Sequence, residues 1–442
     1  MYSDEIETFL KSKGIKTGDR IRVEYSGVTI EGDLMPKTEA GRHDTIIVKL
    51  KSGYNVGIAF GNARITKMNG QAVEPGSSPK SKVKQDAKLP KISLIYTGGT
   101  IGNKIDYRTG GVYPLLKPEE LLHEIPELSK IANITVKSPF SMASEDLSYA
   151  EWQKIAHEVA SEINSGARGV VVTIGTDTMH YVSAALSFML QDLNAPVVLT
   201  GAQRSSDRGS SDAFMNLICA AQLAAKSDIA EVGICMHRSS SDKECQFMRG
   251  TKVRKMHSSR RDAFRPINDS AIAFVTSDGK IDYNGHYKKI GKGKTTVKAG
   301  FENNVALIKV HPNSTPGIID FYVDMGYKGI ILEGTGLGHT PVGPSNKKGS
   351  WIPQIGGAIK KGVVIGMTTQ TLYGRVNANV YTNLRKVSEL GVVYCEDMLP
   401  ETAYVKLGWL LGNYDAKKAK ELLNRNIVGE INERIGYDEF LV

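Results

Sequence analysis

The sequence has few cysteines and no long apolar run, and both absences exclude whole classes of protein. Four cysteines occur in 442 residues, without a CxxC pair or a metal-ligand spacing; they are Cys219, Cys235, Cys245 and Cys395. A disulfide-stapled fold is therefore disfavoured, and free thiols in a reducing compartment are expected. No apolar run approaches the roughly 20 residues that a membrane-spanning helix needs. Residues 1–7 lack the basic-then-apolar layout of a signal peptide, so we expect a cytoplasmic protein without a membrane partner.

Histidines are also too scattered to indicate a metal site. His237, His257, His286 and His339 are not clustered at ligand spacing, so no metal is predicted. A hydrophobic content of 41% with 23% charged residues is typical of a globular protein. A chain of 442 residues is too long for one ordinary core, which predicts two or three domains. The net charge of +9 is moderate and leaves an acidic partner such as RNA open.

Residues 1–73 have the pattern of a small β-barrel preceded by a helix. Ile6, Phe9 and Leu10 fall on one face of a helix expected at 4–13. Short alternating runs between turn residues predict strands at 20–25, 28–32, 44–50 and 56–58. Residues 74–90 carry no apolar periodicity and are rich in Pro, Ser and Lys, which indicates a linker.

From Lys91 onward, strand patterns alternate with helix patterns, which predicts an α/β architecture of doubly wound parallel sheets. In a large domain over 91–290, strands are expected at 92–96, 169–174, 196–200, 231–235 and 271–275, and helices at 149–164, 182–190 and 213–225. In a smaller domain over 291–442, strands are expected at 305–310, 329–332, 362–367 and 391–394.

Two threonine-centred segments follow buried-looking strands. Residues 97–102 (TGGTIG) and 175–178 (GTDT) come directly after the first and second strands expected in the large domain. Because parallel strands of an open α/β sheet place their chemistry at the carboxyl edge, both segments can reach one crevice. A threonine hydroxyl is a poor nucleophile until a neighbouring group takes its proton. Asp177 and a lysine from residues 249–255 (RGTKVRK) are candidates for that task.

These segments resemble the signature motifs of the bacterial-type L-asparaginase family. The likeness extends over about residues 91–430 and is carried by TGGTI at 97–101, SED at 144–146, GTDT at 175–178, TGAQR at 200–204, RGTKVRK at 249–255 and DAF at 262–264. Aligning both ends of the lysine-containing segment places the family's catalytic lysine on Lys255 and not on Lys252. The resemblance implies an asparaginase-like fold of two α/β domains.

The resemblance also implies covalent acyl transfer at a carboxamide. Thr100 would attack the amide carbon, and Tyr107, on a mobile loop, would close over the site and help to take the proton. Thr176, Lys255 and Asp177 would activate a hydroxyl or the hydrolytic water. The order in which the two threonines act stays open.

Substrate binding is implied for a second group of residues. Ser144 and Glu145 correspond to the family segment that binds the α-carboxylate and α-amino groups of the substrate, and Glu145 stands where the family has glutamine. Backbone N–H groups of the glycine-rich turns at Gly99 and Gly175 would meet the oxyanion. No cofactor is implied for this chain.

Residues 1–90 lie outside that likeness. An asparaginase-like body behind a small β-barrel resembles the D-subunit family of archaeal two-subunit glutamyl-tRNA(Gln) amidotransferases, as do residues 174–181 (IGTDTMHY) and 205–212 (SSDRGSSD). Such a glutaminase subunit would take ammonia from glutamine or asparagine and pass it through a dry tunnel to an E subunit. That partner would hold tRNA(Gln) and use ATP and Mg to activate the mischarged glutamate. A homodimer core within an α2β2 assembly is also implied.

Two other functions stay open. A stand-alone L-asparaginase would hydrolyse asparagine without a tRNA role, but it gains nothing obvious from a barrel and a tether. An RNA-binding barrel on an inactive α/β body is the non-enzymatic alternative, and the intact threonine, aspartate and lysine set speaks against it. The nine Lys and Arg of residues 238–265 fit a solvated face, a source of charge that keeps Lys255 neutral, or a docking surface for the E subunit and its RNA.

Overall fold

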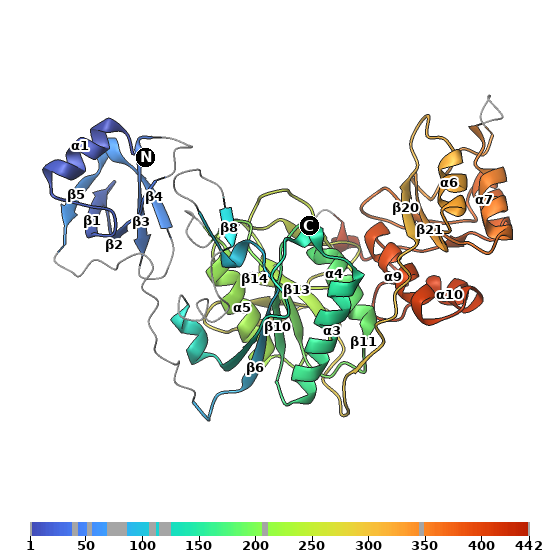
Figure 1. The fold of residues 1–442 in the computed structure, drawn as a ribbon, viewed down its shortest axis with the longest axis horizontal. Coiled ribbons are helices and arrows are strands. Elements are labelled where there is room, and N and C mark those ends of the chain that lie inside the picture. The colour runs from blue at the N-terminus through green and yellow to red at the C-terminus, as the bar shows by residue number, and fades with distance from the viewer. Residues whose placement is uncertain are drawn as a thin grey trace.

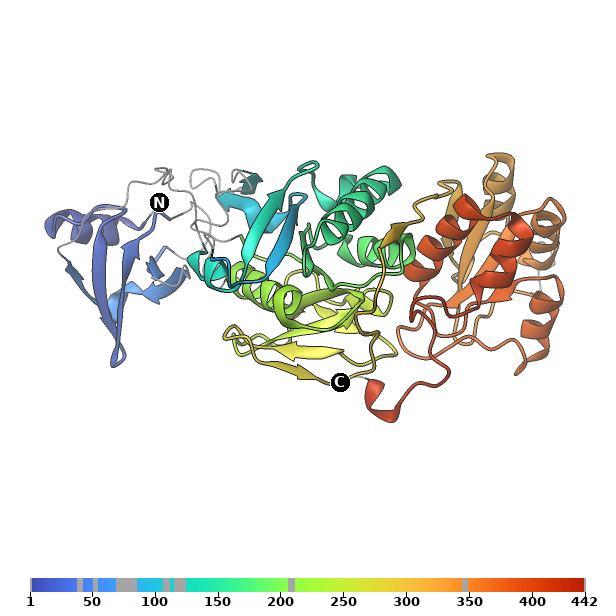
Figure 2. The same ribbon diagram turned by 90° about the horizontal axis from the view of Figure 1, so that it is seen from below.

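The structure, a computed structural model, describes residues 2–37, 43–50, 55–68, 86–105, 112–114, 125–205, 211–343 and 349–440. Two views at right angles show three bodies in a row (Figures 1 and 2). An N-terminal domain lies at one end, the large α/β domain in the middle and the small α/β domain at the other end.

The N-terminal domain is a five-stranded antiparallel sheet with one helix. Its elements are α1 (Asp4–Ser12), β1 (Arg20–Tyr25), β2 (Val28–Leu34), β3 (Thr45–Leu50), β4 (Asn55–Ala59) and β5 (Arg64–Lys67). Ile6 and Leu10 of α1 are buried against the alternate side chains Ile21 and Val23 of β1, as the periodicity predicted. The strand order is β4-β3-β2-β1-β5. Among the described residues β4 and β5 stand at the two ends of this order, so the closure into a barrel that the sequence predicted stays a prediction.

The large domain is built on a mixed eight-stranded sheet. Its strands are β6 (Lys91–Tyr96), β9 (Asn133–Lys137), β10 (Val170–Thr173), β12 (Val197–Thr200), β13 (Val232–His237), β14 (Cys245–Arg249), β17 (Ala273–Val275) and β18 (Ile281–Tyr283), in the order β18-β17-β14-β13-β12-β10-β6-β9. Strands β9, β6, β10, β12 and β13 run parallel. The prediction of wholly parallel sheets is wrong for β14, β17 and β18, which pair antiparallel.

Helices cover both faces of this sheet (Figure 1). They are α3 (Tyr149–Asn164) and α4 (Met179–Met189) on one face and α5 (Ala213–Lys226) on the other. Ser148 caps α3, and Glu151 accepts from the Ser148 backbone to complete a capping box. Three short two-stranded pairs complete the domain: β7 (Asn103–Ile105) with β8 (Val112–Pro114), β11 (Leu190–Gln191) with β19 (Thr296–Val297), and β15 (Val253–Lys255) with β16 (Phe264–Pro266).

The small domain is a parallel four-stranded sheet with helices on both faces. Its elements are β20 (Val305–Lys309), α6 (Gly317–Asp324), β21 (Gly329–Gly334), α7 (Ile352–Lys360), β22 (Val364–Thr369), α8 (Thr382–Glu389), β23 (Val393–Tyr394), α9 (Pro400–Asn413) and α10 (Ala416–Leu423). The apolar sides of α6, α7 and α8 form one core with the sheet. Helix α9 belongs to the core that contains α3 and α4 of the large domain.

The contacts between the large domain and the small domain include an aromatic stack and a buried ion pair. The ring of Phe188 on α4 stacks on Trp409 of α9, with 5.6 Å between centroids. The Lys252 ammonium lies 2.5 Å from Asp397, and both side chains are fully buried. Asp397 also accepts from the backbone N–H of Asn432 at 3.0 Å. A buried ion pair of this kind resists separation because either partner left alone would be a charge without solvent.

The structure also bears on thiols, membrane-spanning helices and groups of metal-ligating side chains in the described part of the chain. All four cysteines are buried free thiols. Within the described ranges, no helix combines the length and the apolar character needed to cross a bilayer. No group of His, Cys, Asp and Glu in the described part of the chain is arranged to hold a metal ion.

The substitution Lys252→Met is expected to lower the free energy of unfolding by about 3–5 kcal/mol. The reason is that Asp397 stays buried and keeps only Arg375, at 3.9 Å, as a cationic neighbour. The double variant Lys252→Met with Asp397→Asn should recover much of that loss, since no buried charge is left and the Asn432 contact can persist. Chemical denaturation of the three proteins measures this. Equal losses in the single and double variants would contradict the ion pair as the source.

Candidate active site

Parallel pairing brings the two threonine segments to one edge of the sheet. Tyr96 of β6 is in register with Thr173 of β10, so both strands end side by side. The Thr97 hydroxyl donates to the Thr173 carbonyl at 2.9 Å, and Thr97 is buried. Thr97 thus closes the strand end, and Thr100, which opens a 3-10 turn at Thr100–Gly102, is the half-buried hydroxyl of its segment.

Glycines let the two segments touch backbone to backbone. Gly99 has φ +86°, and a Cβ there would lie 2.5 Å from the Gly175 nitrogen. A Cβ on Gly175 would lie 2.7 Å from the Ser144 Cβ. No larger residue fits at either position without displacing the chain. Thr100 and Thr176 each follow one of these glycines, so the contact brings both of them and Ser144 to one place.

Lys255 completes the group from a different part of the chain. Its Nζ donates to Thr176 Oγ1 at 2.9 Å and to Asp177 Oδ1 at 2.6 Å. The Lys255 side chain is 10% exposed, whereas Asp177 is 69% exposed. Consecutive residues on a strand would point apart, but here the turn after β10 lets Thr176 and Asp177 both face Lys255 Nζ. Lys252, the alternative in the same segment, is held by Asp397 and lies outside this group.

The predicted substrate residues border the same turn. Ser144 is buried at the start of a 3-10 turn, Ser144–Asp146, and its carbonyl accepts from the Thr178 hydroxyl at 2.7 Å. Ser144 Oγ lies 3.4 Å from a carboxylate oxygen of Glu145, which is exposed. A serine hydroxyl beside a carboxylate can bind both the α-carboxylate and the α-ammonium of an amino acid. Tyr107, the predicted lid residue, lies outside the described residues.

His180, to which the sequence assigned no role, lies close to this charged group. Burial lowers its pKa to about 4, with Arg254 and Lys255 acting in the same direction and Asp177 opposing them. Its Nδ1 has no hydrogen-bond partner among the described residues. The ring is therefore neutral near pH 7. Its only sequence signal is its place four residues after Thr176, in the first turn of α4.

The basic stretch 238–265 is largely neutralised by its own neighbours. Arg238 pairs with Glu244, Arg261 with Asp242, Arg254 with Glu401, and both Arg260 and Arg265 with Asp262. The hydrogen bond from Arg260 is the main cause that lowers the pKa of Asp262 to about 2. The pairing leaves little unbalanced charge in the stretch. It is not a uniformly solvated face, because Lys252, Lys255 and Arg249 are only 0%, 10% and 14% exposed.

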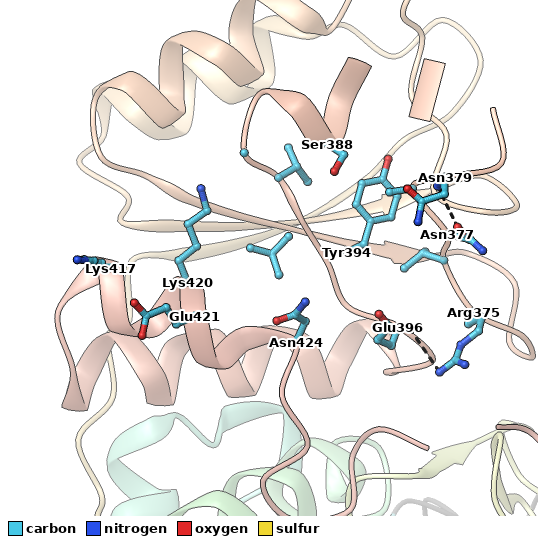
Figure 3. A pocket seen from close by; sticks show the side chains of 15 residues that line it. Arg375, Asn377, Asn379, Ser388, Tyr394, Glu396, Lys417, Lys420, Glu421 and Asn424 are labelled. Atoms are coloured by element: carbon cyan, nitrogen blue, oxygen red, sulfur yellow. Dashed lines mark hydrogen bonds and ion pairs between the residues drawn. The ribbon is translucent and has the colours of Figure 1, made fainter. Parts of the chain in front are cut away.

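A large cavity of about 730 Å³ lies elsewhere, on the small domain. Figure 3 shows polar side chains around it, among them the paired Arg375 and Glu396, with Lys417 and Lys420 from α10. None of the threonine-segment residues or Lys255 lines it. This cavity therefore does not coincide with the bonded group of Lys255, Thr176 and Asp177.

Comparison with known proteins agrees with this architecture. Residues 91–289 match the family described as asparaginase, N-terminal, and residues 304–423 match the glutaminase/asparaginase C-terminal domain. A solved L-asparaginase from Thermococcus kodakarensis is 30% identical, with a TM-score of 0.68, over 78% of this chain and 100% of that one. L-asparaginase I from Vibrio cholerae is 29% identical, with a TM-score of 0.67, over 78% of this chain and 99% of that one. The fold and the site thus define a protein of the asparaginase structural class.

The N-terminal domain and the full-length relatives define the family more narrowly. Residues 15–68 match the GatD N-terminal domain. The D subunit of glutamyl-tRNA(Gln) amidotransferase from Pyrococcus furiosus is 50% identical over 99% of this chain and 100% of its own length. The D subunit from Methanothermobacter thermautotrophicus is 46% identical over 98% of each chain. The chain belongs to the family of glutamyl-tRNA(Gln) amidotransferase D subunits.

Replacing His180 by glutamine should flatten the acid sensitivity of folding. The folded ring has a pKa near 4, and the unfolded ring has its ordinary value near 6.5, so the unfolded chain takes up the proton first as the pH falls. Stability is therefore lost between pH 6.5 and about 4, by up to about 3 kcal/mol. Denaturant unfolding at pH 7 and pH 4.5 measures the difference. If His180→Gln and wild type lose equal stability, the ring is already protonated in the folded protein.

Proposed function

We propose that this chain is the glutaminase subunit of a tRNA-dependent amidotransferase. It releases ammonia from glutamine or asparagine, and a partner E subunit uses that ammonia to convert Glu-tRNA(Gln) into Gln-tRNA(Gln). The observation that carries the proposal is the bonded set of Lys255, Thr176 and Asp177 next to the Gly99–Gly175 backbone contact, which directly precedes Thr100 and Thr176, in a chain of the D-subunit family.

The reaction proceeds through an acyl-enzyme. Thr100 Oγ forms a bond to the side-chain amide carbon, the hydroxyl proton passes to the leaving nitrogen, and the C–N bond breaks to give ammonia. Tyr107 assists the proton transfer from its loop. Water then attacks the ester, and its proton passes through the Thr176–Lys255–Asp177 set to Thr100 Oγ. The bond between Thr100 Oγ and the acyl carbon breaks and frees glutamate, or aspartate when asparagine is the donor. Backbone N–H groups at Gly99 and Gly175 stabilise the oxyanion, where one donor contributes about 2.7–4 kcal/mol in other enzymes.

Ser144 and Glu145 select the substrate by binding its α-carboxylate and α-ammonium groups. Ser144 donates to the α-carboxylate, and the exposed carboxylate of Glu145 attracts the α-ammonium. The paired charge makes a free amino acid a better substrate than an amide inside a peptide, which lacks both ionised groups. The chain needs no cofactor of its own.

The proposed assembly follows because one subunit releases ammonia and the other uses it. Ammonia must remain neutral to react, so it travels through a dry passage to the E subunit, which holds tRNA(Gln), ATP and Mg. A homodimer core within an α2β2 heterotetramer, working in the cytoplasm, accommodates both subunits.

Thr100→Val and Lys255→Ala are each expected to abolish amide hydrolysis while folding survives, since each removes a group that handles the reacting bond. Thr97→Val is the matched control: it removes a buried hydroxyl in the same segment and costs about 1 kcal/mol of stability with activity kept. Ammonia release from glutamine, by the full chain with its E subunit, is the measurement.

Hydrolysis retained by either variant would overturn the assigned role. The same assay separates the proposal from the stand-alone L-asparaginase. For an amidotransferase subunit, turnover is low in the isolated chain and rises with the E subunit and charged tRNA. Full turnover by the isolated chain would favour the independent hydrolase.

A further inference from the structure

The loop that follows β12 forms a wall directly behind Thr176. A Cβ on Gly201 would lie 2.5 Å from the Ile174 carbonyl oxygen and 3.2 Å from the Thr176 methyl carbon. The Ile174 N–H donates to the Thr200 carbonyl at 3.0 Å. Any shift of the loop backbone at residues 201–204 therefore moves the turn that carries Thr176.

Asp212, the residue before α5, holds this loop because its side chain accepts hydrogen bonds from the loop backbone. Its carboxylate is fully buried and accepts from the N–H groups of Gln203, at 3.0 Å, and Arg204, at 3.1 Å. It makes no capping bond to its own helix. Burial raises the pKa of the Asp212 carboxyl, and the two backbone donors and the nearby His237 oppose that shift. The side chain is thus committed to the loop.

Asn216, one turn further along α5, holds the same loop and has only one possible orientation. Its Nδ2 donates to the Gly201 carbonyl at 3.0 Å and to Asp212 Oδ2 at 2.9 Å. Its Oδ1 accepts from the backbone N–H of His237 at 3.1 Å. A flipped amide would face two acceptors with an oxygen and a donor with a nitrogen, so the assignment is fixed by its neighbours.

His237, the last residue of β13, locks that orientation from the other side. Its fully buried ring places Nδ1 2.6 Å from Asn216 Oδ1 and Nε2 3.0 Å from Asp242 Oδ1. Both neighbours are oxygens that accept hydrogen bonds, so a ring nitrogen that carries a proton donates to the oxygen beside it. Asp242 also accepts from Arg261 at 2.7 Å. A continuous chain of hydrogen bonds therefore runs from the wall behind Thr176 to a half-exposed carboxylate.

We propose that Asn216 and His237 are positioning residues for the amide-hydrolysing site: they fix the 201–204 loop, and through it the turn that presents Thr176 to Lys255. This inference rests on the role of Thr176 in the proposed function. The Gly201 carbonyl and the N–H groups of Gln203 and Arg204 are bonded here by side chains of α5. The exact place of the loop consequently depends on the orientation of the Asn216 amide. Displacements of about 1 Å near reacting groups can cost on the order of 100-fold in rate.

Two substitutions of His237 separate its hydrogen bond to Asn216 from its hydrogen bond to Asp242. In His237→Asn the amide nitrogen replaces Nδ1 and keeps the donor toward Asn216, but loses Asp242. In His237→Gln the amide nitrogen replaces Nε2 and keeps the donor toward Asp242, but loses Asn216. Gln222→Leu is the control, since it removes a buried amide of the same helix that bonds Ser277, away from the loop.

Values of kcat and KM for glutamine are measured with the full chain and its E subunit, well below each unfolding midpoint. His237→Gln should lower kcat by about 10- to 100-fold with little change in KM, while His237→Asn stays within a few-fold of wild type. Gln222→Leu should lower the midpoint and keep kcat.

Equal kcat in the two His237 variants, or a loss that follows the midpoint in all three, would assign the network to folding alone and overturn the inference. If the wild-type complex releases no ammonia, the proposed function fails and this inference fails with it.

Discussion

The contact between Gly99 and Gly175 is the constraint on which the rest of the site depends. Two parallel strands end together, and the turns that follow them approach until a single Cβ would overlap the opposite backbone. That closeness places the residues after each glycine, Thr100 and Thr176, at the same edge of the sheet. Hydrogen bonds from Lys255 then add the charged group. The close approach of two glycine backbones, which leaves no room for a side chain, therefore determines where Thr100 and Thr176 lie.

The segment that supplies Lys255 also ties the protein together. Lys252 and Lys255 are three residues apart, yet one is fully buried against Asp397 and the other bonds Thr176. The first contact joins the large domain to the small domain, so the position of β15 is fixed by the same packing that closes the domain junction. A change at the junction therefore reaches the site through a very short piece of chain. His180 is buried near the same lysine, and its lowered pKa keeps the ring neutral near pH 7. The free energy of unfolding is therefore expected to fall in acid.

Features that depend on neighbouring residues in the sequence were predicted better than features that depend on strand pairing. The helix expected at 149–164 is α3 residue for residue, because its apolar spacing and capping residue are local features. The threonine segments and Lys255 were found by their spacing and family likeness. Strands β14 and β18 form hairpins with the strands that precede them, and they were missed because they are short. Strand β9 was missed because its partner β6 is distant in sequence. The link from Asn216 to His237 had no sequence signal for the same reason: it forms between α5 and β13 only after both have packed.

The most direct test of the central claim is to trap the acyl-enzyme. Full-length chain with its E subunit is mixed with glutamine, quenched rapidly in acid and analysed by peptide mass spectrometry. One glutamyl ester is expected on the peptide that carries Thr100, and none in the Thr100→Val variant. A glutamyl group on a residue away from the Gly99–Gly175 contact, or ammonia release with no covalent species on either threonine at any quench time, would contradict the central claim.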